Sequence, residues 1–204
     1  MKGYYRIVFY MIFVNICFSA IDLDFNFAMT VEQKVQLILA KAEDLSKNKG
    51  NHDLALKMCN EAIKMQSGYL EPYYRRAFVF GRKGDYVNAV KDFSIVIKND
   101  EKNEKMKYPA ARKFRADCFM GLGYMQKAVD DYSVMLKRDS KSNGSGKIWY
   151  YYAEALALMN KTELAVNAIQ QGCSTGSHWC EKMRILQKKI LIGEEIKPHK
   201  PFSN

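Results

Sequence analysis

The chain has 204 residues, of which 48% are hydrophobic and 26% are charged, and its formal net charge is +10. This balance is ordinary for a soluble globular protein that can bury a substantial core, and it excludes a low-complexity chain. Only four Pro and 12 Gly stand against many strong helix formers, so intrinsic propensity favours helices throughout.

Residues 1–20 differ from everything that follows them. Lys2 and Arg6 precede an apolar run that begins at Ile7, and small residues follow, ending at Ala20. This order is typical of a secretory signal peptide. An uncleaved membrane anchor is the alternative, but the apolar run is shorter than the roughly 20 residues that span a bilayer. We therefore expect cleavage near Ala20, an exported protein, periplasmic or secreted, and no transmembrane segment after cleavage.

After a short lead-in, residues 21–30, one phrase recurs along the chain. GDYVNAVKDF begins at Gly84 and GYMQKAVDDY begins at Gly123, with Gly, Ala, Val, Asp and an aromatic residue at identical offsets. Weaker copies begin at Gly50 and Asn160. The alanines of the four copies lie 34, 39 and 37 residues apart: Ala55, Ala89, Ala128 and Ala165. A period in this range is typical of stacked helical hairpins.

Each part of the phrase has a physical reason. Gly at the start accepts the left-handed conformation that closes a helix C-terminus, so the chain turns there. The small Ala lets the two helices of a hairpin approach closely, while aromatic residues such as Tyr73 and Phe93 fill the space beside it. The sequence therefore predicts repeated pairs of facing helices, with Ala at each crossing.

These residues make the chain resemble a tetratricopeptide-repeat (TPR) protein over about residues 31–177. The resemblance rests on the stretches that begin at Tyr73, Phe114 and Trp149, and on a weaker stretch from Leu39. The Pro that usually closes each unit of that family is missing. The resemblance implies an all-α fold, an α-solenoid of about four helix-turn-helix hairpins.

The last hairpin of such an array would expose an apolar side, so it needs a cap. We expect residues 178–192 to form a capping helix whose apolar residues cover that side: Trp179, Met183, Ile185, Leu186 and Ile190. Cys173 and Cys180 flank the preceding turn, and an exported protein meets an oxidising compartment, so we predict a disulfide between them. Residues 193–204 are expected to be a flexible tail.

No catalytic constellation emerges from the sequence. The three histidines are His52, His178 and His199, and none stands near a nucleophile and an orienting acid in a recognised spacing. A metal site built from His178, Cys173 and Cys180 would lack a fourth ligand. We therefore expect a protein that is not an enzyme, with no metal and no cofactor.

The TPR resemblance implies that a protein or peptide partner binds in the concave groove lined by the first helix of each hairpin. One step beyond the packing stripe, these helices present aromatic and charged side chains, which suit a peptide ligand. The candidate contacts are Tyr74, Phe78, Lys113, Asp117, Tyr150 and Glu154. For Tyr74 and Tyr150 the alternative is that they only pack between neighbouring hairpins.

The positive charge leaves a second function open, a basic exported factor that binds an anionic polymer or a membrane surface. Its contacts would come from residues 98–115 and from lysines near the C-terminus: Lys188, Lys189, Lys197 and Lys200. Acidic residues lie among these bases, which favours a solvated loop and helix start over a polyanion site. No nucleic-acid partner is expected.

Overall fold

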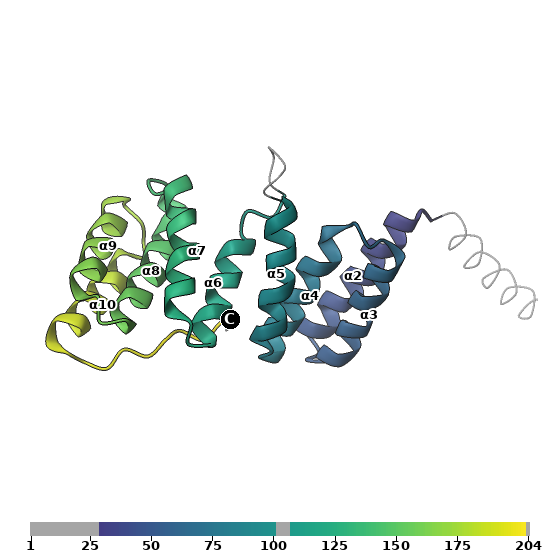
Figure 1. Ribbon diagram of the computed structural model, residues 1–204, viewed down its shortest axis with the longest axis horizontal. Helices are drawn as coiled ribbons and strands as arrows, with labels where there is room; N and C mark the ends of the chain where they lie inside the picture. Colours follow the sequence, from purple (N-terminus) through teal and green to yellow (C-terminus); the bar gives the residue numbers. More distant parts are fainter. Residues whose placement is uncertain (1–28, 101–106, 203–204) are drawn as a thin grey trace, which may run out of the picture.

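The structure is a computed structural model that describes residues 29–100 and 107–202, so the expected leader lies outside the described residues. This part of the chain forms four helical hairpins and a final helix, and no strand (Figure 1). The hairpins are α2 (Val31–Lys47) with α3 (His52–Met65), α4 (Leu70–Lys83) with α5 (Tyr86–Asp100), α6 (Ala111–Gly121) with α7 (Met125–Arg138), and α8 (Gly146–Leu158) with α9 (Thr162–Ser174). A 3-10 turn, Asn143–Ser145, precedes α8, and α10 (Cys180–Ile192) follows α9. The predicted all-α solenoid of about four hairpins with a capping helix is confirmed.

The turns inside the hairpins use the residues that begin each copy of the phrase. Gly50, Gly84 and Gly123 have φ of 64°, 84° and 76°, all left-handed. In the fourth copy Asn160 takes the same place with a φ of 58°. Asn is among the few residues other than Gly that enter this conformation readily, so the degenerate copy keeps the same turn.

The alanine of each copy lies at the crossing of its two helices. Ala55, Ala89, Ala128 and Ala165 are all 0% exposed. In the two central hairpins the aromatic residue four positions later, Phe93 or Tyr132, is also fully buried. The repeated phrase therefore marks the same packing site in every hairpin, as the sequence predicted.

The Asp of the two strong copies belongs to an ion pair inside its own hairpin. Arg76 on α4 reaches Asp92 on α5 through two hydrogen bonds, in which Nε and Nη2 donate over 2.7 and 2.8 Å. Arg115 on α6 reaches Asp131 on α7 in the same way, over 2.7 Å for both bonds. We call these four residues the Arg–Asp seam. Its bidentate geometry is the strongest kind of side-chain hydrogen bonding in proteins.

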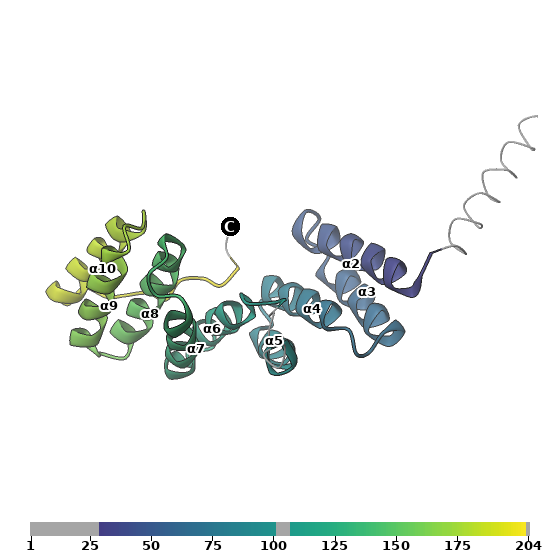
Figure 2. The same cartoon turned by 90° about the horizontal axis from the view of Figure 1, so that it is seen from above.

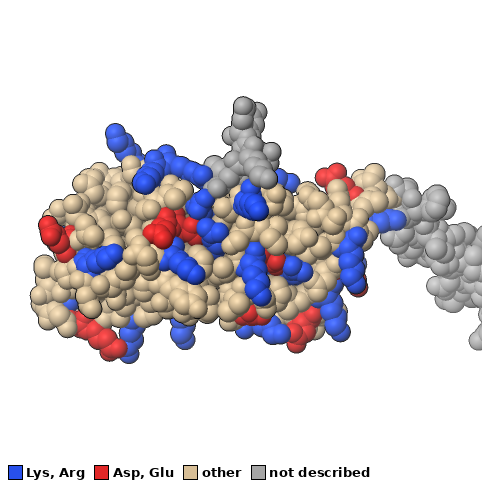
Figure 3. Space-filling model, viewed as in Figure 1, with Lys and Arg blue, Asp and Glu red and all other residues tan. Residues whose placement is uncertain are grey.

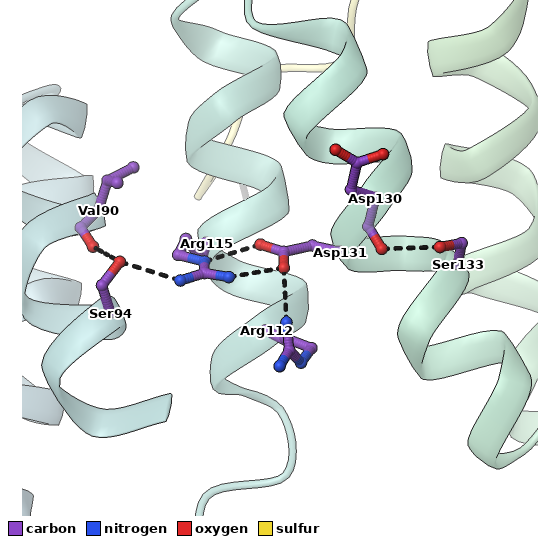
Figure 4. A network of polar contacts seen from close by, with 7 residues as sticks. All are labelled: Val90, Ser94, Arg112, Arg115, Asp130, Asp131 and Ser133. Atoms are coloured by element: carbon purple, nitrogen blue, oxygen red, sulfur yellow. Dashed lines mark hydrogen bonds and ion pairs between the residues drawn. The ribbon is translucent and has the colours of Figure 1, made fainter. Parts of the chain in front are cut away.

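Each arginine of the seam also ties its hairpin to the one before it. Arg76 donates to the side-chain oxygen of Asn60 on α3 over 2.6 Å, and Arg115 donates to Ser94 on α5 over 3.0 Å. Asp131 accepts a further bond from Arg112 over 2.9 Å. Figure 4 shows the contacts of Arg115, which link the successive helices α5, α6 and α7. The seam therefore joins neighbouring hairpins as well as the two helices of one hairpin.

The helix α10 caps the array, and a disulfide joins Cys173 on α9 to Cys180 at its start, as predicted. Met183 and Leu186 are buried against the last hairpin. The expectation for Ile185 was wrong, because its side chain is 52% exposed. Ile185 lines a hollow with Tyr150 and Glu154 of α8. The cap therefore uses a narrower stripe than the sequence suggested.

Candidate peptide groove

The concave side of the array is crossed by the last residues of the chain. After Gly193, which ends α10 with a φ of 70°, residues 194–202 run back over α8 and α6 towards α4 (Figure 2). We call residues 194–202 the tail. The sequence predicted a flexible tail for residues 193–204. The structure places Pro201 in a buried position and holds His199 and Phe202 between first helices.

His199 of the tail lies between two buried carboxylates. Its Nδ1 is 2.5 Å from Oε2 of Glu154 on α8, and its Nε2 is 3.6 Å from Oδ1 of Asp117 on α6. The second distance is too long for a hydrogen bond, and Nε2 has no hydrogen-bond partner. The imidazole also stacks on Tyr151, with ring centroids 3.9 Å apart. We call Asp117 and Glu154 the acid pair.

The electrostatics of the acid pair favour a cation between its members. Burial alone would lower the pKa of His199, but the two carboxylates outweigh burial and raise that pKa above the ordinary value of 6.5. Burial likewise disfavours the charged form of Asp117, yet His199, Lys113 and Tyr132 outweigh it and hold the pKa of Asp117 below its ordinary value. The geometry thus suits a protonated imidazole or another cation.

Asp117 has two partners within the array besides the tail. Lys113, one turn earlier on α6, donates to Oδ2 over 2.5 Å, and the hydroxyl of Tyr132 on α7 donates to Oδ1 over 2.7 Å. Glu154 is hydrogen-bonded to the His199 ring and accepts a second hydrogen bond from the backbone N–H of His199 over 3.4 Å. The tail therefore supplies two hydrogen bonds to Glu154.

Phe202 occupies a second position in the groove, closer to the N-terminal end of the array. Its ring lies edge-on to Phe78 on α4, with centroids 5.9 Å apart, and stacks on Phe114 of α6 at 6.1 Å. A Cβ atom on Gly81 would lie 2.3 Å from the Phe202 ring, so only glycine leaves room for it. We call Phe78, Gly81 and Phe114 the aromatic seat.

An open hollow of about 260 Å³ continues the groove beyond the aromatic seat, between α2 and α4. Tyr74, Phe78 and Phe114 supply its apolar wall. Its charged wall includes Arg75, which pairs with Glu43 on α2 and, over 2.6 Å, with Glu71 on its own helix. A ligand longer than the tail could extend into this hollow.

The six predicted contact residues divide into three groups. Asp117 and Glu154 converge on His199, and Lys113 supports Asp117. Phe78 belongs to the aromatic seat, and Tyr74 packs beside it, with ring centroids 5.0 Å apart. Tyr150 packs on Trp179 at 5.5 Å and lines a separate hollow of about 510 Å³ with tail residues 194–197.

The groove contains contacts that the sequence did not reveal. His199 and Phe202 lie in the segment that was expected to be flexible, and Gly81 and Tyr151 were not selected. A signal was present for Gly81, because a glycine inside a helix often marks a close approach. No periodic pattern marks His199, since its partners come from helices more than forty residues away.

The basic side chains on α6 are paired with acidic ones. Arg112, Lys113 and Arg115 all pair with buried acids, Asp131 and Asp117. On the face in Figure 3, blue and red side chains are interspersed over the whole array.

Within residues 29–100 and 107–202, no three His, Cys, Asp or Glu side chains are placed to hold a metal ion. Cys59 and Cys118 are buried and free, and burial raises the pKa of each thiol to about 12, so neither is a ready nucleophile. Over the same residues, no helix combines the length and the apolar character that a membrane span needs.

The fold is similar to that of solved structures of MamA and of a TPR protein. Two structures of MamA, a double mutant from strain RS-1 and a form from residue 41 onward of Desulfovibrio magneticus RS-1, match with a TM-score of 0.62 and 16% identity. They cover 78% of this chain and 89% and 90% of their own. A TPR protein from Parabacteroides merdae matches with a TM-score of 0.65 and 15% identity, covering 79% of this chain and 61% of its own. No protein-family model and no curated protein matches. The likeness shows the TPR-like fold.

Proposed function

We propose that this protein is a non-enzymatic, exported scaffold whose concave groove binds an extended segment of a protein partner. One observation carries the proposal. The groove already holds a non-helical segment, the tail, through side chains of three successive first helices, α4, α6 and α8. A surface that accommodates one extended segment has the shape and the chemistry to accommodate another.

The groove combines the features that peptide recognition requires. The aromatic seat and the rings beside it offer an apolar surface of the kind that dominates binding energy at interfaces. The acid pair supplies a charged contact that fixes the position of a ligand along the groove. Both sets of side chains stand on helices, which hold them in place more firmly than loops would.

Export is part of the proposal. The leader-like residues 1–20 support it, and the disulfide between Cys173 and Cys180 is compatible with an oxidising compartment. The partner would then be a protein of the same compartment.

Site-specific photo-crosslinking tests the groove directly. A photoreactive amino acid at position 150, in the groove, is compared with one at Lys91, which is exposed on the second helix α5. We expect the groove position to crosslink to a defined segment of a partner, mapped by mass spectrometry. Equal crosslinking from Lys91 and position 150 would contradict the proposal.

A variant pair separates binding from packing. Tyr150→Ala removes a ring that lines the groove, whereas Leu164→Ala removes an exposed side chain on α9. We expect Tyr150→Ala to lower partner recovery about tenfold, the size of an ordinary interface hot spot, and Leu164→Ala to leave it unchanged. Equal recovery with both folded variants would remove position 150 from the site.

A further inference from the structure

We propose that the groove recognises a segment with a cationic side chain followed three residues later by an aromatic one, and that the tail occupies the groove as an internal copy of this ligand. The inference rests on the proposed function and names the chemistry of the partner. The ligand is a segment of a separate protein, which competes with residues 194–202 for the same positions.

The cationic position is defined by the acid pair. Two buried carboxylates, on α6 and α8, face one imidazole from opposite sides. Both are almost fully buried, Asp117 at 4% and Glu154 at 3% exposure. Leaving such carboxylates without a partner is costly, so the groove selects against a neutral or acidic side chain here. The ring of Tyr151 beneath the imidazole adds a contact that a planar cation such as arginine also makes.

The aromatic position is defined by the absence of a side chain at Gly81 on α4. At position 81 only glycine leaves space for the Phe202 ring, because the three atoms nearest to an added Cβ all belong to that ring. Phe78 and Phe114 close the seat from two sides. The seat therefore selects a flat ring over a branched aliphatic side chain.

The backbone between the two positions is also recognised. Pro201 is buried and approaches α6 at Gly121, where an added Cβ would lie 3.0 Å from the proline ring. The residue before a proline favours an extended conformation, which spaces His199 and Phe202 across two neighbouring helices. His199, Pro201 and Phe202 of the tail thus each contact the groove.

Competition with the tail determines how tightly a partner must bind to occupy the groove. A tethered segment acts at a high effective concentration, and the apparent affinity of an outside ligand falls by the fraction of molecules whose groove is open. A partner of the same chemistry then binds only when it is abundant, or when it extends into the open hollow between α2 and α4 that the tail leaves empty.

A fluorescent peptide with the sequence of residues 194–204 tests the proposal. It is titrated into the wild-type full-length chain and into a release variant, His199→Ala with Phe202→Ala, whose own tail lacks both anchoring side chains. We expect the release variant to bind the peptide at least about tenfold more tightly than the wild type, because its groove is free. Equal affinity for both proteins, or no binding to the release variant, would overturn the proposal.

Two further variants test each position in the release background. Gly81→Ala fills the aromatic seat, and Glu154→Gln removes one charge of the acid pair without changing its shape. Each should weaken peptide binding at least about tenfold. Gly81→Ala replaces Gly with a better helix former, so a loss of binding does not reflect a lost helix. Full binding by the Gly81→Ala protein would contradict the aromatic seat.

The peptide itself provides matched controls. Peptides in which His199 or Phe202 is replaced by alanine should bind at least about tenfold more weakly, and a His199→Arg peptide should retain binding. Alanine peptides that bind as well as the parent would overturn the recognition rule. A wild-type protein that forms concentration-dependent dimers lost in the release variant would overturn the separate partner and identify a second copy as the occupant.

These outcomes are distinct from a failure of the proposed function. If the tail peptide does not bind but crosslinks from position 150 still map to a partner, the groove binds a ligand of other chemistry. If the peptide binds and no groove crosslink forms, the recognition rule holds for the tail and the proposed binding of a protein partner fails.

Discussion

The Arg–Asp seam and the acid pair both contain buried carboxylates paired with a cationic side chain. They differ in the part of the chain that supplies this cation. Asp92 and Asp131 are each 3% exposed, as buried as Glu154 in the groove. The seam acids are paired by arginines of their own hairpins, sixteen residues away in sequence. Glu154 is paired by His199 from a tail with no helix of its own, 45 residues away. The seam aspartates and Glu154 are thus equally buried, but the ion pairs of the seam stabilise the fold, whereas the ion pair of Glu154 is a contact that another ligand can replace.

The choice of cation fits this difference. Arginine is always charged and binds a carboxylate through two parallel hydrogen bonds, so the seam stays paired at any ordinary pH. Histidine loses its charge in the physiological range and makes one hydrogen bond here. A permanent contact and a removable one are therefore distinguished by residue type.

Removing a seam acid should have the largest effect. Asp131→Ala leaves Arg115 and Arg112 without their shared carboxylate, and breaking a buried ion pair costs about 3–5 kcal/mol of unfolding free energy. Urea denaturation followed by circular dichroism measures it. The matched control is Asp130→Ala, an exposed neighbour, which should change stability by less than about 0.5 kcal/mol. Similar losses from both variants would contradict a stabilising seam.

Overfilling a helix crossing should come second. Ala89→Leu inserts a larger side chain where α4 and α5 cross with no exposed surface, and should cost about 1–3 kcal/mol of unfolding free energy. Ala40→Leu places the same change on an exposed position of α2 and should be nearly neutral. If the two variants melted alike, the crossing would not be the tight contact described here.

Removing the His199 side chain should change the stability of the fold little and should strongly weaken docking of the tail. His199→Ala leaves every hairpin contact in place, so the unfolding free energy should fall by less than about 1 kcal/mol, as for a peripheral contact. Amide hydrogen exchange of residues 194–202 should accelerate, while exchange in α4–α9 should not change. Accelerated exchange across the hairpins would place His199 in the core of the fold instead.

Raising the pH should weaken docking of the tail, because it removes the charge of His199 without removing its side chain. Because the pKa of His199 is raised in the docked state, its contribution to docking is fully present below pH 6.5 and is lost as the pH rises through the docked pKa. Titration by NMR with hydrogen exchange of the tail measures this. The release should be absent in His199→Ala. Asp117, Glu154 and Tyr151 contact the ring. The titratable groups in contact with these three residues are Lys113, Lys147 and Tyr132.

The sequence predicted the array because its signals are local and repeated. Glycine turns and the four alanines recur at fixed offsets, and the Asp that became the seam was part of the same phrase. Its arginine partner also repeats, thirteen residues before Ala89 and Ala128, and could have been found by the same comparison.

The tail could not be predicted in this way. The segment holding His199 and Phe202 has no periodicity, and its place depends on groups that only the folded array assembles, such as the space above Gly81. Asp117 and Glu154 were selected as groove residues from their helical register, yet their convergence on one imidazole follows from the stacking of α6 and α8.

The most direct test of the groove is a nuclear Overhauser measurement between the Phe202 ring protons and the α protons of Gly81 in the full-length protein at a pH below 6.5. The account predicts a strong contact, since the ring lies where a Gly81 side chain would be. Random-coil chemical shifts for residues 197–202 with no contact to α4 would contradict it.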